Sequence, residues 1–282
     1  MNVITLRNAS LHAEVLPGVG GALARFDWIA DGAVRAVFRA CAMPPVSPSE
    51  VACFVMLPWA NRIAPDGFEY GGRTVSLPPN RVGEPCPIHG EGWRSEWKVH
   101  SQSPTDVRLT LDRRGGAPFA YEAVLHYSLL DTALQVTLEV RNCGAYALPF
   151  GLGLHPWFTR GAGVQLHAAA ANRWERGELN LPGAPAAPPA ACDFNDLKRL
   201  PDQGVDHVFG GWDGHAKICL PEQGIALRIG SDMDYFILYA PEGADFFCFE
   251  PIDHLPNGQS AARGLAPGST LRRTVAFAVE TI

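Results

Sequence analysis

The stretch LQVTLEVR, residues 134–141, alternates apolar and polar side chains at every position. Every second residue, beginning at Leu134, is apolar: Leu134, Val136, Leu138 and Val140. Because successive side chains of a strand point to opposite faces, this period of two is typical of a half-buried β-strand. The stretch therefore predicts one strand of a sheet whose apolar face packs on a core.

Similar runs and turn signals recur from one end of the chain to the other. Hairpins are predicted over 68–77 and 216–231, and further strands over 107–111, 235–239, 246–249 and 271–279. No segment of 12 or more residues carries a clear helical stripe, and a short helical turn over 47–55, capped by Ser47 or Ser49, is the one helical candidate. Closely spaced strands of this kind predict an all-β, mostly antiparallel sandwich or barrel.

The composition agrees with a folded chain rich in turns. Of 282 residues 47% are apolar, and 29 Gly and 24 Pro punctuate them without a fixed period. We expect a single domain over 1–282, since a β-sandwich of this length can be one domain. The Pro- and Ala-rich stretch at 181–191 is predicted to be a surface loop or crossover, with a domain boundary as the alternative.

Charge and cysteine usage narrow the class of protein. The net charge of −6 excludes a broad basic surface for nucleic acid, which would need clustered Lys and Arg. No apolar run is long enough for a membrane span, and the N-terminus shows no secretion signal, so we expect a cytoplasmic protein. The seven cysteines are scattered without a C-x-x-C, which favours reduced thiols over a zinc site.

Two ionisable residues stand in unusually apolar, Pro-containing surroundings. His155 lies in PFGLGLHPWF, residues 149–158, and Glu250 lies in FFCFEPIDH, residues 246–254. Desolvation should raise the pKa of Glu250 towards the range that suits a general base. Each residue alone fits a structural role as well, but together they form the acid–base pair that proton-transfer chemistry needs.

Other segments supply side chains that suit sugar binding. Arg62 and His89 offer hydrogen-bond donors, and Asn61 stands beside the first of them. Trp59 and Trp157 offer flat apolar faces for a sugar ring, although core packing is the ordinary role of a tryptophan. Asp206, in VDHVF, is by itself an ordinary turn residue.

In order along the chain, these segments resemble the aldose 1-epimerase, or galactose mutarotase-like, family. The matching motifs are ANRI at 60–63, IHGEGW at 88–93, GLGLHPWF at 151–158, VDHVF at 205–209, and CFEP at 248–251 followed by Pro256-Asn257. The sequence departs from the family at Trp157, where Tyr is common, and in the E-P-I-D-H pattern that contains Glu250.

The resemblance implies a large antiparallel β-sandwich of the galactose mutarotase type, with the sugar in an open cleft across one sheet. It implies that His155 is the general acid that protonates the ring oxygen, and that Glu250 is the general base that takes the proton from the anomeric hydroxyl. The ring opens to the aldehyde, the C1–C2 bond rotates, and re-closure gives the other anomer. His89 and Arg62 would hold sugar oxygens, Asp206 would accept from a hydroxyl, and no metal or cofactor is needed.

Such a pair predicts a bell-shaped pH profile with limbs set by Glu250 and His155, because the base must be ionised while the acid is protonated. The identity of the aldose (galactose, glucose, arabinose or another) and the oligomeric state stay open.

Three alternative functions fit parts of the pattern. A hexose 6-phosphate mutarotase would need two or more cations at the phosphate, with Arg62, Arg81 and Arg94 as candidates. A non-catalytic carbohydrate-binding module would keep the tryptophans and Arg62 but would not need both His155 and Glu250. A glycoside hydrolase would need a second carboxylate beside Glu250, for which Asp206 and Asp253 are the candidates.

Overall fold

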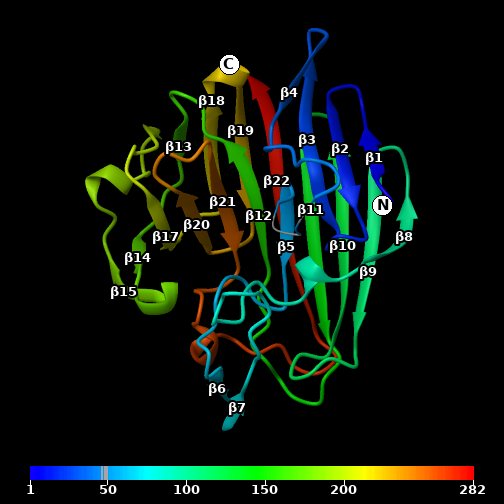
Figure 1. Ribbon diagram of the computed structural model, residues 1–282, viewed down its shortest axis with the longest axis vertical. Helices are drawn as coiled ribbons and strands as arrows, with labels where there is room; N and C mark the ends of the chain where they lie inside the picture. Colours follow the sequence, from blue (N-terminus) through cyan, green and yellow to red (C-terminus); the bar gives the residue numbers. More distant parts are fainter. Residues whose placement is uncertain (46, 48–49) are drawn as a thin grey trace.

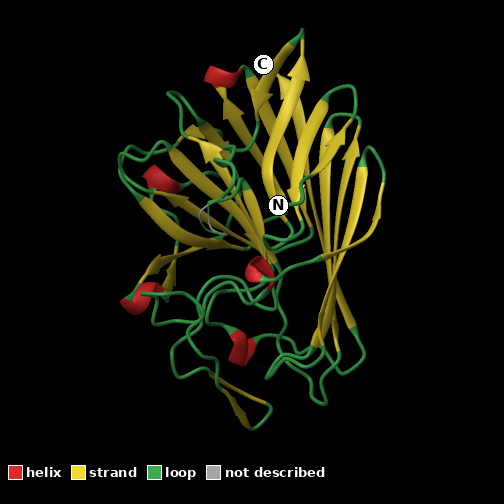
Figure 2. Ribbon diagram, turned by 45° about the vertical axis from the view of Figure 1, so that its right-hand side comes forward, coloured by secondary structure: helices red, strands yellow, loops and turns green. Residues whose placement is uncertain are grey.

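The chain forms two large sheets, as the computed structural model of residues 1–45, 47 and 50–282 shows (Figures 1 and 2). Over those residues the larger sheet has 11 strands, the smaller has 9, and a separate hairpin has 2. Neighbouring strands in both sheets pair antiparallel, and the helical segments are single short turns in the loops (Figure 2). The predicted all-β antiparallel sandwich is confirmed.

The larger sheet carries the strands of the motifs described above. Its spatial order is β1 (Ile4–Arg7), β2 (Leu11–Leu16), β3 (Ala22–Ala30), β5 (Cys53–Met56), β12 (Gly153–Thr159), β21 (Phe246–Ile252), β20 (Tyr235–Ala240), β17 (Val205–Gly210), β14 (Asn172–Arg176) and β15 (Pro182–Ala186), with β4 (Ala33–Ala36) beside β3.

The smaller sheet backs the larger one. Its order is β16 (Lys198–Arg199), β13 (Gln165–His167), β18 (His215–Leu220), β19 (Ile225–Ser231), β22 (Thr270–Thr281), β11 (Ala133–Asn142), β10 (Tyr121–Leu130), β9 (Asp106–Arg113) and β8 (Lys98–Gln102). The hairpin is β6 (Phe68–Tyr70) with β7 (Arg73–Val75). The short 3-10 turns are η1 (Gly92–Arg94), η2 (Glu178–Asn180), η3 (Ala190–Cys192), η4 (Pro221–Gln223) and η5 (Gln259–Ala261).

The alternating stretch at 134–141 lies in β11, at the centre of the smaller sheet between β10 and β22. Its four apolar side chains are buried, whereas Gln135 and Glu139 are partly exposed, so the predicted strand and its inward face are confirmed. The predicted hairpin at 216–231 is β18 and β19, and Gly224 between them has the positive φ of 64° that a turn glycine supplies.

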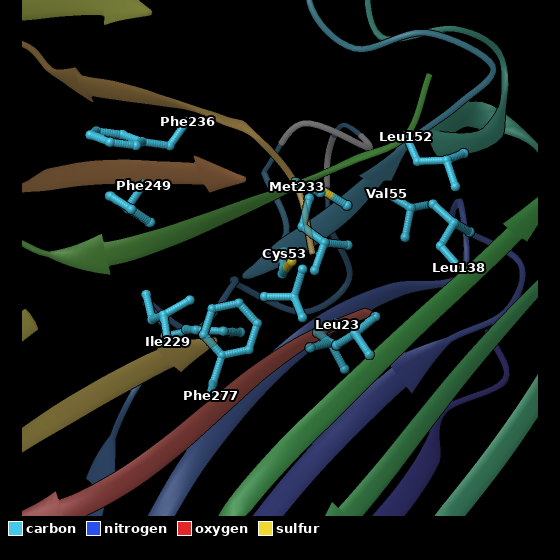
Figure 3. Packing of buried hydrophobic residues seen from close by; sticks show 14 of the residues in the cluster. Leu23, Cys53, Val55, Leu138, Leu152, Ile229, Met233, Phe236, Phe249 and Phe277 are labelled. Carbon is cyan, nitrogen blue, oxygen red and sulfur yellow. The ribbon is translucent and has the colours of Figure 1, made fainter. Parts of the chain in front are cut away.

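The main core fills the space between the two sheets. Figure 3 shows Leu23, Cys53 and Val55 of the larger sheet facing Leu138 and Phe277 of the smaller one. Every one of these side chains is at most 2% exposed. Burial on this scale supplies the main driving force for folding, at roughly 25 cal/mol for each Å² of apolar surface.

The larger sheet also has a second buried face, turned away from that core. Because side chains alternate along a strand, Cys53 and Val55 enter the main core while Phe54 and Met56 enter a second apolar cluster. That cluster includes Ile237, and Trp157 packs against it. The outer face is therefore partly covered, and the covering segments are the loops that carry ANRI and IHGEGW.

Three predictions need correction or comment. Residues 53–55 of the predicted helical turn belong to strand β5, and its proposed cap Ser49 lies outside the described residues. The stretch at 181–191 is largely exposed as expected, but it also contains β15, a Pro-rich edge strand that pairs with β14. Asp206 is not in a turn but in strand β17.

No helix in the described part of the chain has the length and apolar character to cross a lipid bilayer.

Candidate active site

A cavity of about 370 Å³ opens on the outer face of the larger sheet, over β5, β12, β21, β20 and β17. Seven of the eight site residues predicted from the sequence line it. The lining consists of Phe54, Asn61, Arg62, Arg81, Ile88, His89, Trp93, His155, Trp157, Arg176, Asn180, Asp206, Tyr239 and Glu250.

His155, in the middle of β12, packs in a cluster with the rings of Phe54 and Trp157, which also contact each other. Its ring centroid lies 4.5 Å from that of Phe54 and 4.1 Å from that of Trp157, with which it stacks. Phe54 is its register partner on β5, and Trp157 is two residues along β12 on the same face. These contacts bury the imidazole, which is 8% exposed, and restrict the directions in which its nitrogens can point.

Glu250 lies on the neighbouring strand β21, and its Oε1 is 3.3 Å from Nε2 of His155. The carboxylate is 2% exposed, and its Oε2 has no hydrogen-bond partner among the described residues. Desolvation raises the pKa of Glu250 to about 8, against the opposing effect of Arg176. Desolvation also lowers the pKa of His155 to about 3.

Both shifts favour the uncharged form of each group. Burial therefore favours a protonated Glu250 beside a neutral His155 in the free site. The direction expected for the pKa of Glu250 is confirmed, whereas the lowered pKa of His155 opposes an ionised Glu250 beside a protonated His155 in the free site. The physical reason is burial of both groups, which penalises an ion pair unless further partners stabilise it.

His89 reaches the cavity from a loop that is tied to the ANRI segment. The backbone N–H of His89 donates to the carbonyl of Asn61 at 2.9 Å, and the N–H of Asn61 donates to Nδ1 of His89 at 3.3 Å. Burial lowers the pKa of His89 well below its usual range, so the ring is neutral. With Nδ1 accepting, the ring proton lies on Nε2, where it can be donated to an oxygen of a bound molecule.

The backbone of these two loops is unusual where they meet. Asn61 and His89 have φ values of 56° and 59°, and Gly90 has a φ of 68°. A Cβ atom on Gly90 would lie 1.9 Å from the carbonyl oxygen of Leu57, so only glycine fits there. The H-G pair of IHGEGW thus lets the two loops approach closely enough for His89 and Asn61 to bond.

Two arginines that line the cavity are neutralised by carboxylates. Arg62 donates through Nε and Nη2 to Oε2 of Glu84, at 2.9 and 2.7 Å. Arg176 donates through Nε to Oδ1 of Asp206 at 2.8 Å. These pairs fix the guanidinium planes at the cavity wall and leave further N–H groups as donors. Two of the three arginines in the cavity wall are thus paired with carboxylates.

Trp59 is the predicted site residue that the structure places elsewhere. It is 3% exposed, belongs to the main core and packs against Phe119 at 5.7 Å between ring centroids. Its neighbour Asn61 does reach the cavity, because the chain turns between them. Sequence proximity to a motif was a poor guide for this side chain, and core packing is its role.

Seven residues of the lining were not predicted as part of the sugar site. Arg81 was a candidate only for a phosphate, and Ile88 and Trp93 lie in the IHGEGW motif. Phe54, Arg176, Asn180 and Tyr239 were not singled out at all. Tyr239 pairs in register with Asp206 on one side and with Cys248 on the other, so it shares their face of the sheet. Tyr239 lies in the predicted strand over 235–239, but the sequence did not indicate which strands would lie beside it. Arg176 and Asn180 lie in β14 and η2, for which no sequence signal was found.

One cluster offers atoms of the kind that bind metals. A ring nitrogen of His155, Sγ of Cys248 and a carboxylate oxygen of Glu250 lie within 4.8 Å of one another. Metal-ligating histidines almost always donate their other ring N–H to a partner, whereas Nδ1 of His155 has none among the described residues. Burial also raises the pKa of the Cys248 thiol well above its usual value. The cluster therefore lacks the support of a built metal site.

Comparison with protein families gives one match that spans nearly the whole chain. The model of the family described as aldose 1-epimerase matches residues 2–277. Among curated proteins, the uncharacterized protein YphB of Escherichia coli K12 is 33% identical over 247 residues, which cover 82% of this chain and 85% of the relative. The uncharacterized protein YihR of the same organism is 27% identical over 285 residues, covering 90% and 84%.

Solved structures show the same likeness. A crystal structure from Escherichia coli K12, described with a provisional aldose 1-epimerase assignment, superposes with a TM-score of 0.91 at 31% identity and covers 100% of this chain and 99% of that one. The structure of a GalM/aldose epimerase homologue from C. elegans has a TM-score of 0.84 at 18% identity, with coverages of 100% and 99%. At that identity the second likeness concerns the fold alone.

Proposed function

The chain belongs to the aldose 1-epimerase family, and from that premise we propose that it interconverts the α and β anomers of a free aldose by opening and re-closing the sugar ring. One observation carries the proposal. Nε2 of His155 and Oε1 of Glu250, a buried pair of a possible proton donor and a possible proton acceptor, lie 3.3 Å apart in the lining of an open cavity.

One proton on two groups is what this reaction requires. For ring opening, His155 gives a proton to the ring oxygen, and Glu250 takes the proton of the anomeric hydroxyl as the C1–O5 bond breaks. Ring closure on the other face of the aldehyde moves both protons back. The number of protons on the pair is one at the start, in the open-chain state and at the end, so no exchange with solvent is needed.

Burial favours a neutral His155 and a protonated Glu250 in the free site, which is the protonation that the open-chain state would have. To start from the cyclic sugar, the proton must move to His155 and leave Glu250 ionised. Arg62 and Arg176 both lower the pKa of Glu250 and so favour that transfer. The hydroxyl groups of the bound sugar add hydrogen bonds to the carboxylate, which act in the same direction.

The wall of the cavity suits a neutral sugar. Trp157 is half-buried and presents a ring face at the lining, while His89, Arg62 and Arg176 supply N–H donors and Asp206 an acceptor. The side chain of Asn61 helps to hold Arg176 in place, because its Oδ1 accepts a hydrogen bond from Nη1 of Arg176 at 3.4 Å. We propose these residues, with His155 and Glu250, as the substrate site.

The alternatives are less well supported. Arg94 is not in the lining, and Arg62 and Arg176 are engaged by carboxylates, so Arg81 is the one lining arginine for which the described residues show no ion pair. A phosphate would need more free cations than that. For a glycoside hydrolase, Asp253 is paired to Arg273 away from the cavity and Asp206 is paired to Arg176.

Polarimetry tests the proposal. Freshly dissolved α-D-galactose, α-D-glucose and L-arabinose, and glucose 6-phosphate beside them, are followed with the wild type, with Glu250→Gln and with His155→Asn. We expect faster mutarotation of at least one free sugar, lost in both variants. Acceleration confined to the phosphorylated sugar would favour the alternative substrate class, and none with any sugar would favour a binding protein.

A further inference from the structure

The residues that follow Glu250 contact the loop that carries Asn61 and Arg62. His254 and Asn257 belong to the segment EPIDHLPN, residues 250–257, and neither lines the cavity. Each nevertheless accepts a hydrogen bond from the backbone of the loop at residues 60–64. The N–H of Ala60 donates to Nε2 of His254 at 3.3 Å, and the N–H of Ala64 donates to Oδ1 of Asn257 at 2.9 Å.

These two hydrogen bonds are the first and the last of five that the backbone N–H groups of residues 60–64 donate. The loop lies outside the named strands, yet all five of its backbone N–H groups have partners. Between the outer bonds, Asn61 donates to Nδ1 of His89, Arg62 to Oδ1 of Asn61, and Ile63 to the carbonyl of Pro87. The middle bonds join the loop to residues 87 and 89 or to itself, so among these five bonds only the outer ones join it to the segment that bears Glu250.

His254 is built to act as an acceptor. Its Nδ1 lies 2.9 Å from the carbonyl oxygen of Leu255, which can only accept, so the proton lies on Nδ1 and Nε2 is free to accept from Ala60. The ring is buried, and burial lowers its pKa, which keeps Nε2 unprotonated. Gly151 makes room for it, because a Cβ atom there would lie 1.8 Å from Cδ2 of the ring.

Asn257 is suited to its place in a different way. Its φ is 57°, a conformation that Asn and Gly adopt more readily than other residues. Its side chain turns back to the loop, whereas the residue itself is exposed. The backbone conformation and the acceptor role can therefore be separated by substitution.

We propose that His254 and Asn257 are positioning residues, which hold the loop of Asn61 and Arg62 at a fixed distance from Glu250 through the N–H groups of Ala60 and Ala64. The proposal rests on the proposed function for its effect on sugar binding. The base and the loop that supplies binding groups are thus tied together by the same eight-residue stretch of chain. Neither residue touches the reacting atoms.

Two matched pairs of variants test the proposal. Asn257→Gly keeps the positive φ and removes the acceptor, whereas Asn257→Asp keeps the acceptor. His254→Leu removes the ring nitrogen, whereas His254→Gln can place an oxygen near the position of Nε2. We expect the KM for the sugar to rise about five-fold in Asn257→Gly and His254→Leu with kcat within about two-fold, since one net hydrogen bond is worth about that factor.

The acceptor-retaining variants should restore the KM to within about two-fold of the wild type, a rescue that a merely structural role would not produce. Equal impairment of both members of each pair, or no change in any variant, would overturn the proposal. If His254→Leu fails to fold, the exposed Asn257 pair decides the question alone.

Amide hydrogen exchange separates this proposal from the proposed function. If the wild type accelerates the mutarotation of no sugar, the proposed function fails, but the loop can still be examined. Faster exchange at residues 60–64 in Asn257→Gly than in Asn257→Asp would support the positioning role. Identical exchange in the two variants would contradict it.

Discussion

The two faces of the larger sheet bury their side chains to a similar extent but use burial differently. On β12 and β21 the inner face presents Leu154 and Phe249, which are 1% and 0% exposed and pack in the main core. The outer face presents His155 and Glu250, which are 8% and 2% exposed. Burial of the first pair stabilises the fold, whereas burial of the second shifts two pKa values and prepares proton transfer.

The difference teaches that burial of side chains lowers the stability of the fold on the outer face, where the groups are ionisable, and raises it on the inner face, where they are apolar. Ionisable groups lose hydration when they are buried, and the sheet must be stable enough to hold them there. The inner face supplies that stability. Substitutions on the two faces should therefore separate activity from stability.

The largest effect is expected from adjacent residues on β21. Glu250→Gln should lower kcat by about 10³-fold, within the range by which a positioned general base accelerates a reaction, while thermal stability is kept or increased because a desolvated carboxyl is removed. Phe249→Leu, the matched control on the inner face, should cost roughly 1–3 kcal/mol of unfolding free energy and leave kcat of the folded protein nearly unchanged. Kinetics and thermal unfolding of both variants would check this, and a Phe249→Leu protein as inactive as Glu250→Gln would break the comparison.

The pH dependence should follow the shared proton on the outer face. The raised pKa of Glu250, about 8, means that the pair keeps its proton at neutral pH and loses it as the pH rises through that value. Activity should therefore be retained at neutral pH and fall about ten-fold for each pH unit well above 8. A kcat/KM profile between pH 5 and 10 measures it, because kcat/KM reports the pKa values of the free enzyme. A profile that is still rising at pH 9 would show that a fully deprotonated pair is the active form.

The paired carboxylate on β17 should matter for binding. Asp206→Asn removes the ion pair with Arg176 and weakens a charge-assisted bond at the cavity wall, so we expect the KM to rise about ten-fold with a smaller change in kcat. Asp112→Asn removes a carboxylate from an exposed arginine pair on the smaller sheet and serves as the control. The two variants having the same KM would remove Asp206 from the site.

The smallest effect is expected from the tryptophans. Trp157→Phe trims the ring that stacks on His155 and faces the cavity, and should raise the KM about three-fold. Trp59→Phe, in the main core, should lower the unfolding temperature and leave the KM unchanged. An altered KM in Trp59→Phe alone would reverse the assignment of the two tryptophans.

Much of this comparison could be predicted from the sequence because alternation is a local property. The run at 134–141 revealed a strand and its inner face, and the apolar setting of Glu250 indicated the direction of its pKa shift. The register between strands is not local, so the alignment of Asp206 with Tyr239, and hence the face they share, could not be derived.

The ion-pair partners of the charged groups could not be predicted from the sequence either. Arg176 lies 30 residues from Asp206 in the chain and gave no pattern of its own, yet it contributes most to opposing the desolvation of Glu250. The order of the two pKa values depends on how deeply each group of the pair is buried, which no single segment specifies. The prediction for Trp59 was wrong because its place beside a motif does not tell whether its side chain points into the cavity or into the core.

The most direct test of the central claim is anomer exchange at equilibrium, followed by magnetisation transfer between the anomeric proton signals of the preferred sugar. Wild type and Glu250→Gln are compared at neutral pH, with sugar binding measured by calorimetry on the same samples. The account predicts exchange with the wild type, its loss in Glu250→Gln, and binding by both. Binding without exchange by the wild type would contradict it and make the outer face of the sheet a binding surface only.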